Sequence, residues 1–159
     1  MALLSLVLWI HILAAAAWIG GMIFITLVIV PVERGIQDNK LRYELVNKIG
    51  TRFKYLGWGG IIILITTGLY NALQKISAWN DLINTSYGKT LLLKLALVFI
   101  MISLSILHDF YLGPKLVERG TEGRATNLTR FLTILARGNL FLGLLVILLA
   151  VTLRFGGVL

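Results

Sequence analysis

Four long apolar runs, separated by three polar connections, account for most of this 159-residue chain. A membrane-spanning helix needs about 20 mainly apolar residues. The runs are continuous and do not alternate at every second residue, which favours helices over the strands of a transmembrane barrel. We therefore predict an all-α integral membrane protein, a four-transmembrane-helix bundle that forms a single domain over residues 1–159. The expected spans are residues 2–30, 55–73, 90–112 and 131–153.

The first run also has to be compared with a cleaved signal peptide. A signal peptide has a basic N-terminal region followed by an apolar stretch of about 7–15 residues. The first run has no Lys or Arg before it closes at Pro31, and it is much longer than such a stretch. We expect it to be retained as the first helix of the bundle.

Two short motifs recur in the same order and indicate an internal repeat. Val-Glu-Arg-Gly follows the first span at 32–35 and the third at 117–120, and Thr-Arg-Phe precedes the second span at 51–53 and the fourth at 129–131. We predict two helical hairpins arranged as a parallel repeat. The first motif recurs after 85 residues, which places Lys94 at the depth of position 9 and His108 at the depth of position 23.

Composition supports the membrane assignment, and the charges suggest an orientation. The chain is 58% apolar and 14% charged, with a net charge of +8, whereas soluble domains are about 25% charged. Ten of the 15 Lys and Arg residues lie in the connections after the first and third spans. Because positive charge collects on the cytoplasmic side, we expect both termini outside, in the inner (cell) membrane of a bacterium or archaeon. Charge in short connections favours the lipid bilayer over nucleic acid as a partner.

Ionisable side chains inside a span are costly in lipid, so each one points to a functional site. The spans contain His11, Lys94, His108 and Arg137. With the repeat as a ruler, His11 lies about 3 Å in depth from Lys94 and about 18 Å from His108. His11 and His108 are therefore too far apart in depth to bind one haem iron together. We expect His11 and Lys94 to face each other in the outer half of the bundle. His108, Asp109 and Arg137 suggest an ion pair or hydrogen bond near the cytoplasmic side, with a second metal site or a proton entry as the alternative.

The surroundings of His11 suit a flat ligand. Small residues on its helix face leave room for a macrocycle, an aromatic residue can stack below it, and cations at the outer rim can meet propionates. We predict haem b with His11 and Lys94 as metal ligands. The other expected contacts are Trp18, Ala14, Ala15, Thr67, Tyr70, Asn71, Lys89 and Arg154. The alternative is a core histidine with a hydrogen bond and a lysine that reaches the outer surface.

Several stretches resemble the copper-resistance D (CopD-like) membrane family. They are His11 to Gly21 in the first span, Thr67 to Asn71 at the end of the second, and 88–95 with His108-Asp109 in the third. A histidine in the first helix with a lysine in the third also resembles HemJ, a haem-dependent protoporphyrinogen oxidase family. That resemblance implies that His11 and Lys94 are the important residues. Directly after the first span, the chain departs from the HemJ pattern.

Three functions of different classes remain open. The leading hypothesis is a b-type haem redox protein, of electron-transfer or oxidase type, that exchanges electrons with a quinone or another redox partner. The second is a copper-handling or copper-transport protein, and the third is a non-catalytic membrane subunit. Cu(I) prefers thiolate and thioether ligands, and the chain has no Cys and three Met, so copper would need a partner. Glycine-lined spans permit a homo-oligomer.

Overall fold

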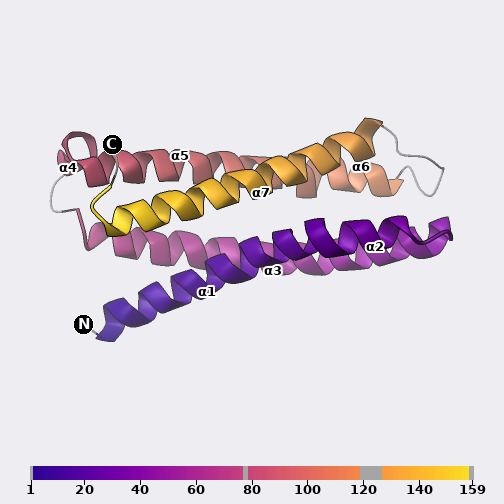
Figure 1. Cartoon of the computed structure of the whole chain (residues 1–159), viewed down its shortest axis with the longest axis horizontal. Helices are drawn as coiled ribbons and strands as arrows, with labels where there is room; N and C mark the ends of the chain where they lie inside the picture. Colours follow the sequence, from indigo (N-terminus) through magenta and orange to yellow (C-terminus); the bar gives the residue numbers. More distant parts are fainter. Residues whose placement is uncertain (1, 77–78, 119–126, 158–159) are drawn as a thin grey trace.

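The computed structural model describes residues 2–76, 79–118 and 127–157, and these form helices and connecting turns (Figure 1). The elements in order are α1 (Ala2–Phe24), η1 (Ile25–Ile29), α2 (Val30–Arg34), α3 (Asn39–Leu73), α4 (Asp81–Asn84), α5 (Ser86–Ile106), η2 (Leu107–Leu112), α6 (Gly113–Glu118) and α7 (Asn127–Arg154). Four continuous helical segments among them are long and apolar enough to cross a membrane. The all-α membrane bundle predicted from the sequence is confirmed.

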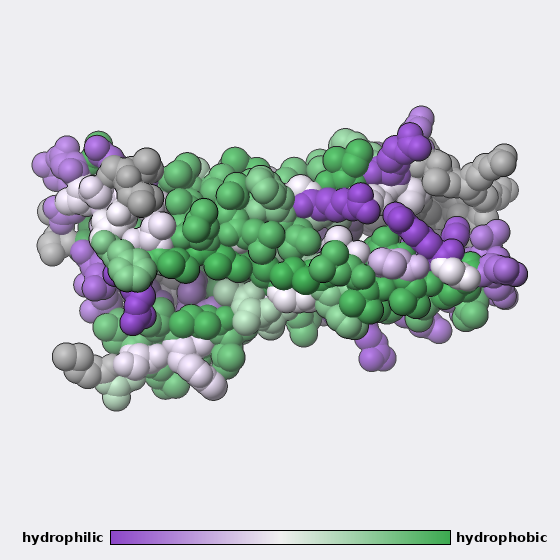
Figure 2. Space-filling model, in the orientation of Figure 1, coloured by the Kyte–Doolittle hydropathy of each residue, from purple (hydrophilic) through white to green (hydrophobic). Residues whose placement is uncertain are grey.

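The four long segments pack as two hairpins. α1 packs against α3, and α5 packs against α7. Both termini and α4 lie at one end of the bundle, which we call the termini end, and α2 and α6 lie at the other, which we call the basic end (Figure 1). A broad apolar band covers the middle of the surface, with hydrophilic side chains gathered towards the two ends, as expected of an integral membrane protein (Figure 2).

The second spanning helix is longer than the sequence predicts. α3 begins at Asn39 rather than near Tyr55, because Asp38 caps it by accepting hydrogen bonds from the backbone N–H groups of Lys40 (2.9 Å) and Leu41 (3.2 Å). Its charged first half is rich in good helix formers and has no proline to stop it. A helix of 35 residues is about 52 Å long and exceeds the roughly 30 Å hydrocarbon core. α3 therefore continues beyond the membrane at the basic end.

The first and third spans share an unusual sequence of helix types. Each changes from α-helix to a short π-helix, η1 or η2, and returns to α-helix with Pro31 or Pro114 as its second residue. Proline has no N–H and its ring clashes with the carbonyl of the preceding turn, so a wider turn accommodates it. The two π segments begin 82 residues apart and the prolines lie 83 apart.

These landmarks refine the register of the two halves. An offset of 82 or 83 places Lys94 at position 12 or 11 of the first span, whereas the motif offset of 85 placed it at position 9. η2 is one residue longer than η1, and the motif lies two residues farther beyond Pro114 than beyond Pro31, so the motif overestimates the offset within the membrane. The second copy of that motif extends into 119–126, outside the described residues. Lys94 and His11 thus lie at equivalent depths in the two halves.

Candidate functional sites

His11 projects from α1 against α3, where a glycine makes room for it. A Cβ added to Gly68 would lie 3.1 Å from His11 Cε1. The ring contacts Thr67 through a 2.7 Å hydrogen bond between Nδ1 and Oγ1, and the Thr67 hydroxyl donates to the carbonyl of Ile63 at 2.5 Å. When the hydroxyl donates its one proton to Ile63, it accepts from His11 Nδ1, and a neutral His11 then carries its proton on that nitrogen. Its Nε2 is then a free lone pair, available to a metal.

Lys94 reaches the same region from α5. It is half-buried within its span and close enough to His11 to interact with it electrostatically. The two predicted residues therefore lie in the same half of the bundle, at equivalent depths on α1 and α5. Of the other predicted contacts, Ala15, Tyr70 and Asn71 are half-buried, and Lys89 and Arg154 are exposed at the termini end.

Two of the residues expected beside a haem, Trp18 and Ala14, lie where α1 packs against α3. Trp18 is 7% exposed and belongs to the buried cluster with Ile61 and Met101. A Cβ added to Gly57 would touch its ring at 3.5 Å, and one added to Gly60 would lie 3.8 Å from the carbonyl of Ala14. Trp18 and Ala14 thus pack α1 against α3, because glycines on α3 let the two helices approach closely, and Trp18 also lines the cavity in the basic half described below.

A second polar site forms where η2 meets α3. Gly113 N–H bonds to the His108 carbonyl, and Pro114 has no N–H to offer the next carbonyl, that of Asp109. Lys54 provides the missing donor, with Nζ 3.1 Å from that carbonyl oxygen. The same ammonium lies 3.9 Å from the centre of the Phe110 ring. The proline-induced π-helix thus exposes a backbone acceptor, and α3 binds it.

The Asp109 carboxylate is bound on both oxygens. His108 Nδ1 lies 2.8 Å from Oδ1, and Trp58 Nε1 donates to Oδ2 at 3.0 Å. Tryptophans often anchor helices at the membrane surface, but the N–H of Trp58 donates inside the bundle. The predicted pairing of His108 with Asp109 is present, whereas Arg137 is exposed and forms no ion pair with any described residue. Because Asp109 accepts the Nδ1 proton, Nε2 of a neutral His108 is free.

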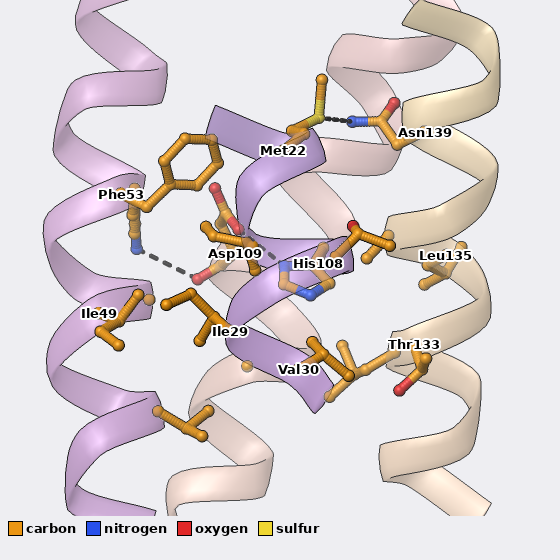
Figure 3. A pocket seen from close by; sticks show the side chains of 18 of the residues that line it. Met22, Ile29, Val30, Ile49, Phe53, His108, Asp109, Thr133, Leu135 and Asn139 are labelled. Carbon is orange, nitrogen blue, oxygen red and sulfur yellow. Dashed lines mark hydrogen bonds and ion pairs between the residues drawn. The ribbon is translucent and has the colours of Figure 1, made fainter. Parts of the chain in front are cut away.

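A cavity of about 1490 Å³ opens beside this site in the basic half of the bundle. Met22, His108, Asp109 and Asn139 all line it (Figure 3). Asn139 is 8% exposed, and its Nδ2 donates to Ser105 Oγ at 3.0 Å and contacts Met22 Sδ at 4.0 Å. One cavity therefore presents a thioether, an imidazole, a carboxylate and an amide.

Met22 and Asn139 were not predicted from the sequence. For Met22, the depth of His108 derived from the repeat was an available signal. The motif offset of 85, which places His108 at the depth of position 23, puts it beside Met22, whereas the offset of 82 or 83 from the π segments and the prolines puts it at position 26 or 25. The two histidines belong to separate sites, as predicted. Their partners on α3, Gly68 for His11 and Trp58 for the Asp109 carboxylate, lie ten positions apart, or about 15 Å along the helix. No cluster of three or more His, Cys, Asp or Glu side chains occurs among the described residues.

A family model described as copper resistance protein D matches residues 47–153. The chain belongs to the CopD family. An uncharacterized protein of Aquifex aeolicus (strain VF5) is 31% identical over 96% of this chain and 96% of its own length. The inner membrane protein YebZ of Escherichia coli (strain K12) is 31% identical over 73% of this chain, and the copper transport protein CutJ of Bacillus subtilis (strain 168) is 28% identical over 63%.

This CopD chain spans only part of the two named relatives, since the matches cover 37% of YebZ and 18% of CutJ. The family match includes Lys94, Trp58 and the His108–Asp109 pair, but it begins after His11 and Met22. No solved structure matches the chain.

Proposed function

We propose that the protein handles copper in the membrane and binds Cu(I) on His108 within the cavity of the basic half. The observation that carries this proposal is the hydrogen bond from His108 to Asp109, which leaves Nε2 free on a cavity that also contains the Met22 thioether. Thioether and imidazole both suit copper. A metal-bound histidine usually donates its other ring N–H to a carboxylate or carbonyl. The CopD family and the copper transport name of CutJ support copper as the cargo.

The histidine in the other half of the bundle suits a second stopping point for the ion. His11 also has one nitrogen committed, here to Thr67, and one nitrogen free. We propose that copper moves between His108 and His11, with the basic end in the cytoplasm and both termini outside. That orientation rests on the concentration of Lys and Arg in the connections at the basic end.

Competition with a Cu(I) chelator such as bicinchoninate, on the purified full chain in detergent under reducing conditions, tests this proposal. We expect one ion bound in the cavity and an affinity at least about tenfold lower in His108→Ala, because an imidazole ligand is lost. His11→Ala is the matched control, since it removes the other imidazole, and it should leave that affinity unchanged. Wild-type protein that fails to compete with the chelator, or a His108→Ala variant that binds like wild type, would contradict the proposal.

Haem binding in the half that contains His11 is the second candidate. The arrangement of His11 with Thr67 and Lys94 favours it, because it offers a free ring nitrogen with an amine nearby. His11 would be the iron ligand and Thr67 its hydrogen-bond partner, whereas Trp18 and Ala14 pack α1 against α3. Haem b, when bound, would supply one-electron chemistry with a quinone or another redox partner. A Soret band that disappears in His11→Ala would support this candidate, and colourless protein after expression with added haem would exclude it.

A further inference from the structure

The cavity in the basic half is far larger than a metal ion requires. Its volume of about 1490 Å³ exceeds the roughly 300–1,000 Å³ of typical small-molecule pockets. Much of its wall is apolar, with side chains from η1, α2, α3 and α7. Figure 3 shows Ile29, Val30, Ile49, Phe53 and Leu135 among them. An open cavity of this size, with apolar walls next to the apolar band of the surface, suits an occupant with a hydrocarbon part.

One wall of the same cavity carries positive charge. Arg130, Thr133 and Arg137 all line it, and their spacing of three and four residues puts them on one face of α7. Both arginines are exposed, and neither forms an ion pair with any described residue. Arginine binds phosphate with two parallel hydrogen bonds, which makes it well suited to a phosphate headgroup.

The opposite wall does not neutralise this charge. Arg34 and Arg42 line the cavity from α2 and α3, together with a single carboxylate there, Glu33. Glu33 lies 3.8 Å from Arg42, so it is already shared with a cation. The hydrophilic side chains gather at this end of the molecule next to the apolar band (Figure 2). The cavity therefore combines apolar walls with a basic rim.

We propose that the cavity binds an anionic phospholipid, with its phosphate on Arg130 and Arg137 and an acyl chain along the apolar walls. Basic pockets between transmembrane helices are suited to anionic lipid headgroups. The lipid meets α7, whereas the copper proposal rests on His108 in η2, so either proposal can fail without the other. This site also gives Arg137 a reason to lie within a span, which the His108–Asp109 pair does not.

Native mass spectrometry of the detergent-solubilised full chain tests this proposal directly. Dioleoyl phosphatidylglycerol and dioleoyl phosphatidylcholine have the same chains and differ in headgroup charge. We expect the anionic lipid to bind about tenfold more tightly, because hydrogen bonds between charged groups are stronger than neutral ones. Equal binding of the two lipids by the wild-type protein would overturn the proposal without any variant.

A double variant locates the headgroup. Arg130→Gln with Arg137→Gln should reduce the phosphatidylglycerol affinity to that of phosphatidylcholine and leave phosphatidylcholine binding unchanged, which also shows that the variant is folded. The matched control is Lys40→Gln with Lys48→Gln, which removes two charges from the same end outside the cavity. Loss of the preference in this control would overturn the assignment. Displacement of the lipid by millimolar inorganic phosphate would also overturn it, because the site would then bind a soluble anion.

Discussion

The Nδ1 atom of His108 lies 2.8 Å from the Oδ1 atom of Asp109, and this contact determines which imidazole nitrogen is free. The carboxylate itself is held in place from α3, because Trp58 donates to its other oxygen and Lys54 binds the Asp109 carbonyl. The His108 ring is therefore oriented before any ion arrives. Such outer contacts fix the ring and make it a better ligand.

Asp109→Asn should weaken Cu(I) binding. The amide keeps the size of the side chain but removes the charge that holds the Nδ1 proton, and such a change costs about 10–100-fold in metal affinity. Competition with a Cu(I) chelator measures it. Trp58→Phe, which leaves the carboxylate and its contact with His108 in place, should have a much smaller effect. An affinity that is equal in wild type and Asp109→Asn would show that the carboxylate does not support the ligand.

Two methionine variants separate a ligand from a packing residue. Met22 lines the cavity, whereas Met101 is 1% exposed in the buried cluster. Met22→Leu should lower the Cu(I) affinity because it removes the thioether. Met101→Leu should leave it unchanged and cost less than about 1.5 kcal/mol of stability, since the volume is conserved. The same chelator titration measures the Cu(I) affinity of both variants. Equal affinities of Met22→Leu and Met101→Leu would count against a sulfur ligand.

Two glycine variants on α3 test the packing of His11. Gly68→Ala should destabilise the protein, because the new methyl group would lie 3.1 Å from His11 Cε1 and force the ring to shift. Gly59 has no atom within 4 Å of an added Cβ, so Gly59→Ala should stabilise the helix by about 0.5–1 kcal/mol. Thermal unfolding in detergent compares them. A Gly68→Ala variant as stable as Gly59→Ala would contradict the position of the ring.

The hydroxyl of Thr67 should decide the tautomer of His11. Thr67→Val removes the only described acceptor for the Nδ1 proton. The neutral tautomer with its proton on Nδ1 is then no longer favoured over the tautomer with its proton on Nε2. Nitrogen-15 NMR of histidine-labelled protein reports which nitrogen carries the proton. We expect the Nδ1–H form in wild type and a shift towards Nε2–H in the variant, with the signals of His108 unchanged. A wild-type His11 protonated on Nε2 would reverse the assignment of its free nitrogen.

The fold could be predicted from sequence because each span is a long apolar run, which is sufficient evidence for a helix in a bilayer. The start of α3 could not be predicted, because two signals conflict after Asn39. The low hydropathy of these charged residues indicates a loop, whereas their intrinsic helix propensities favour a helix. The similar depth of His11 and Lys94 could be predicted from the repeat, although the register was off by two or three residues. A π-helix one residue longer in the second half accounts for part of that shift, and hydropathy does not reveal it.

The second site was harder to predict for a physical reason. The expected third span ends at residue 112, before Pro114, whereas the helix widens there, continues to Glu118 and leaves the Asp109 carbonyl for Lys54 to bind. Tryptophans are common at membrane interfaces, so the sequence alone favours a surface position for Trp58. Only the packing of η2 on α3 shows that its N–H is used within the bundle. Asn139 carries no sequence signal at all, since a lone polar residue in a span does not name its neighbours.

Copper K-edge X-ray absorption of the Cu(I)-loaded protein tests the central claim most directly, because it reports the atoms bound to the ion. In a His11→Ala background, the account predicts scattering from an imidazole and from one sulfur, with the imidazole contribution lost on adding His108→Ala and the sulfur contribution lost on adding Met22→Leu. A spectrum that keeps both contributions in these variants would contradict the placement of copper on His108.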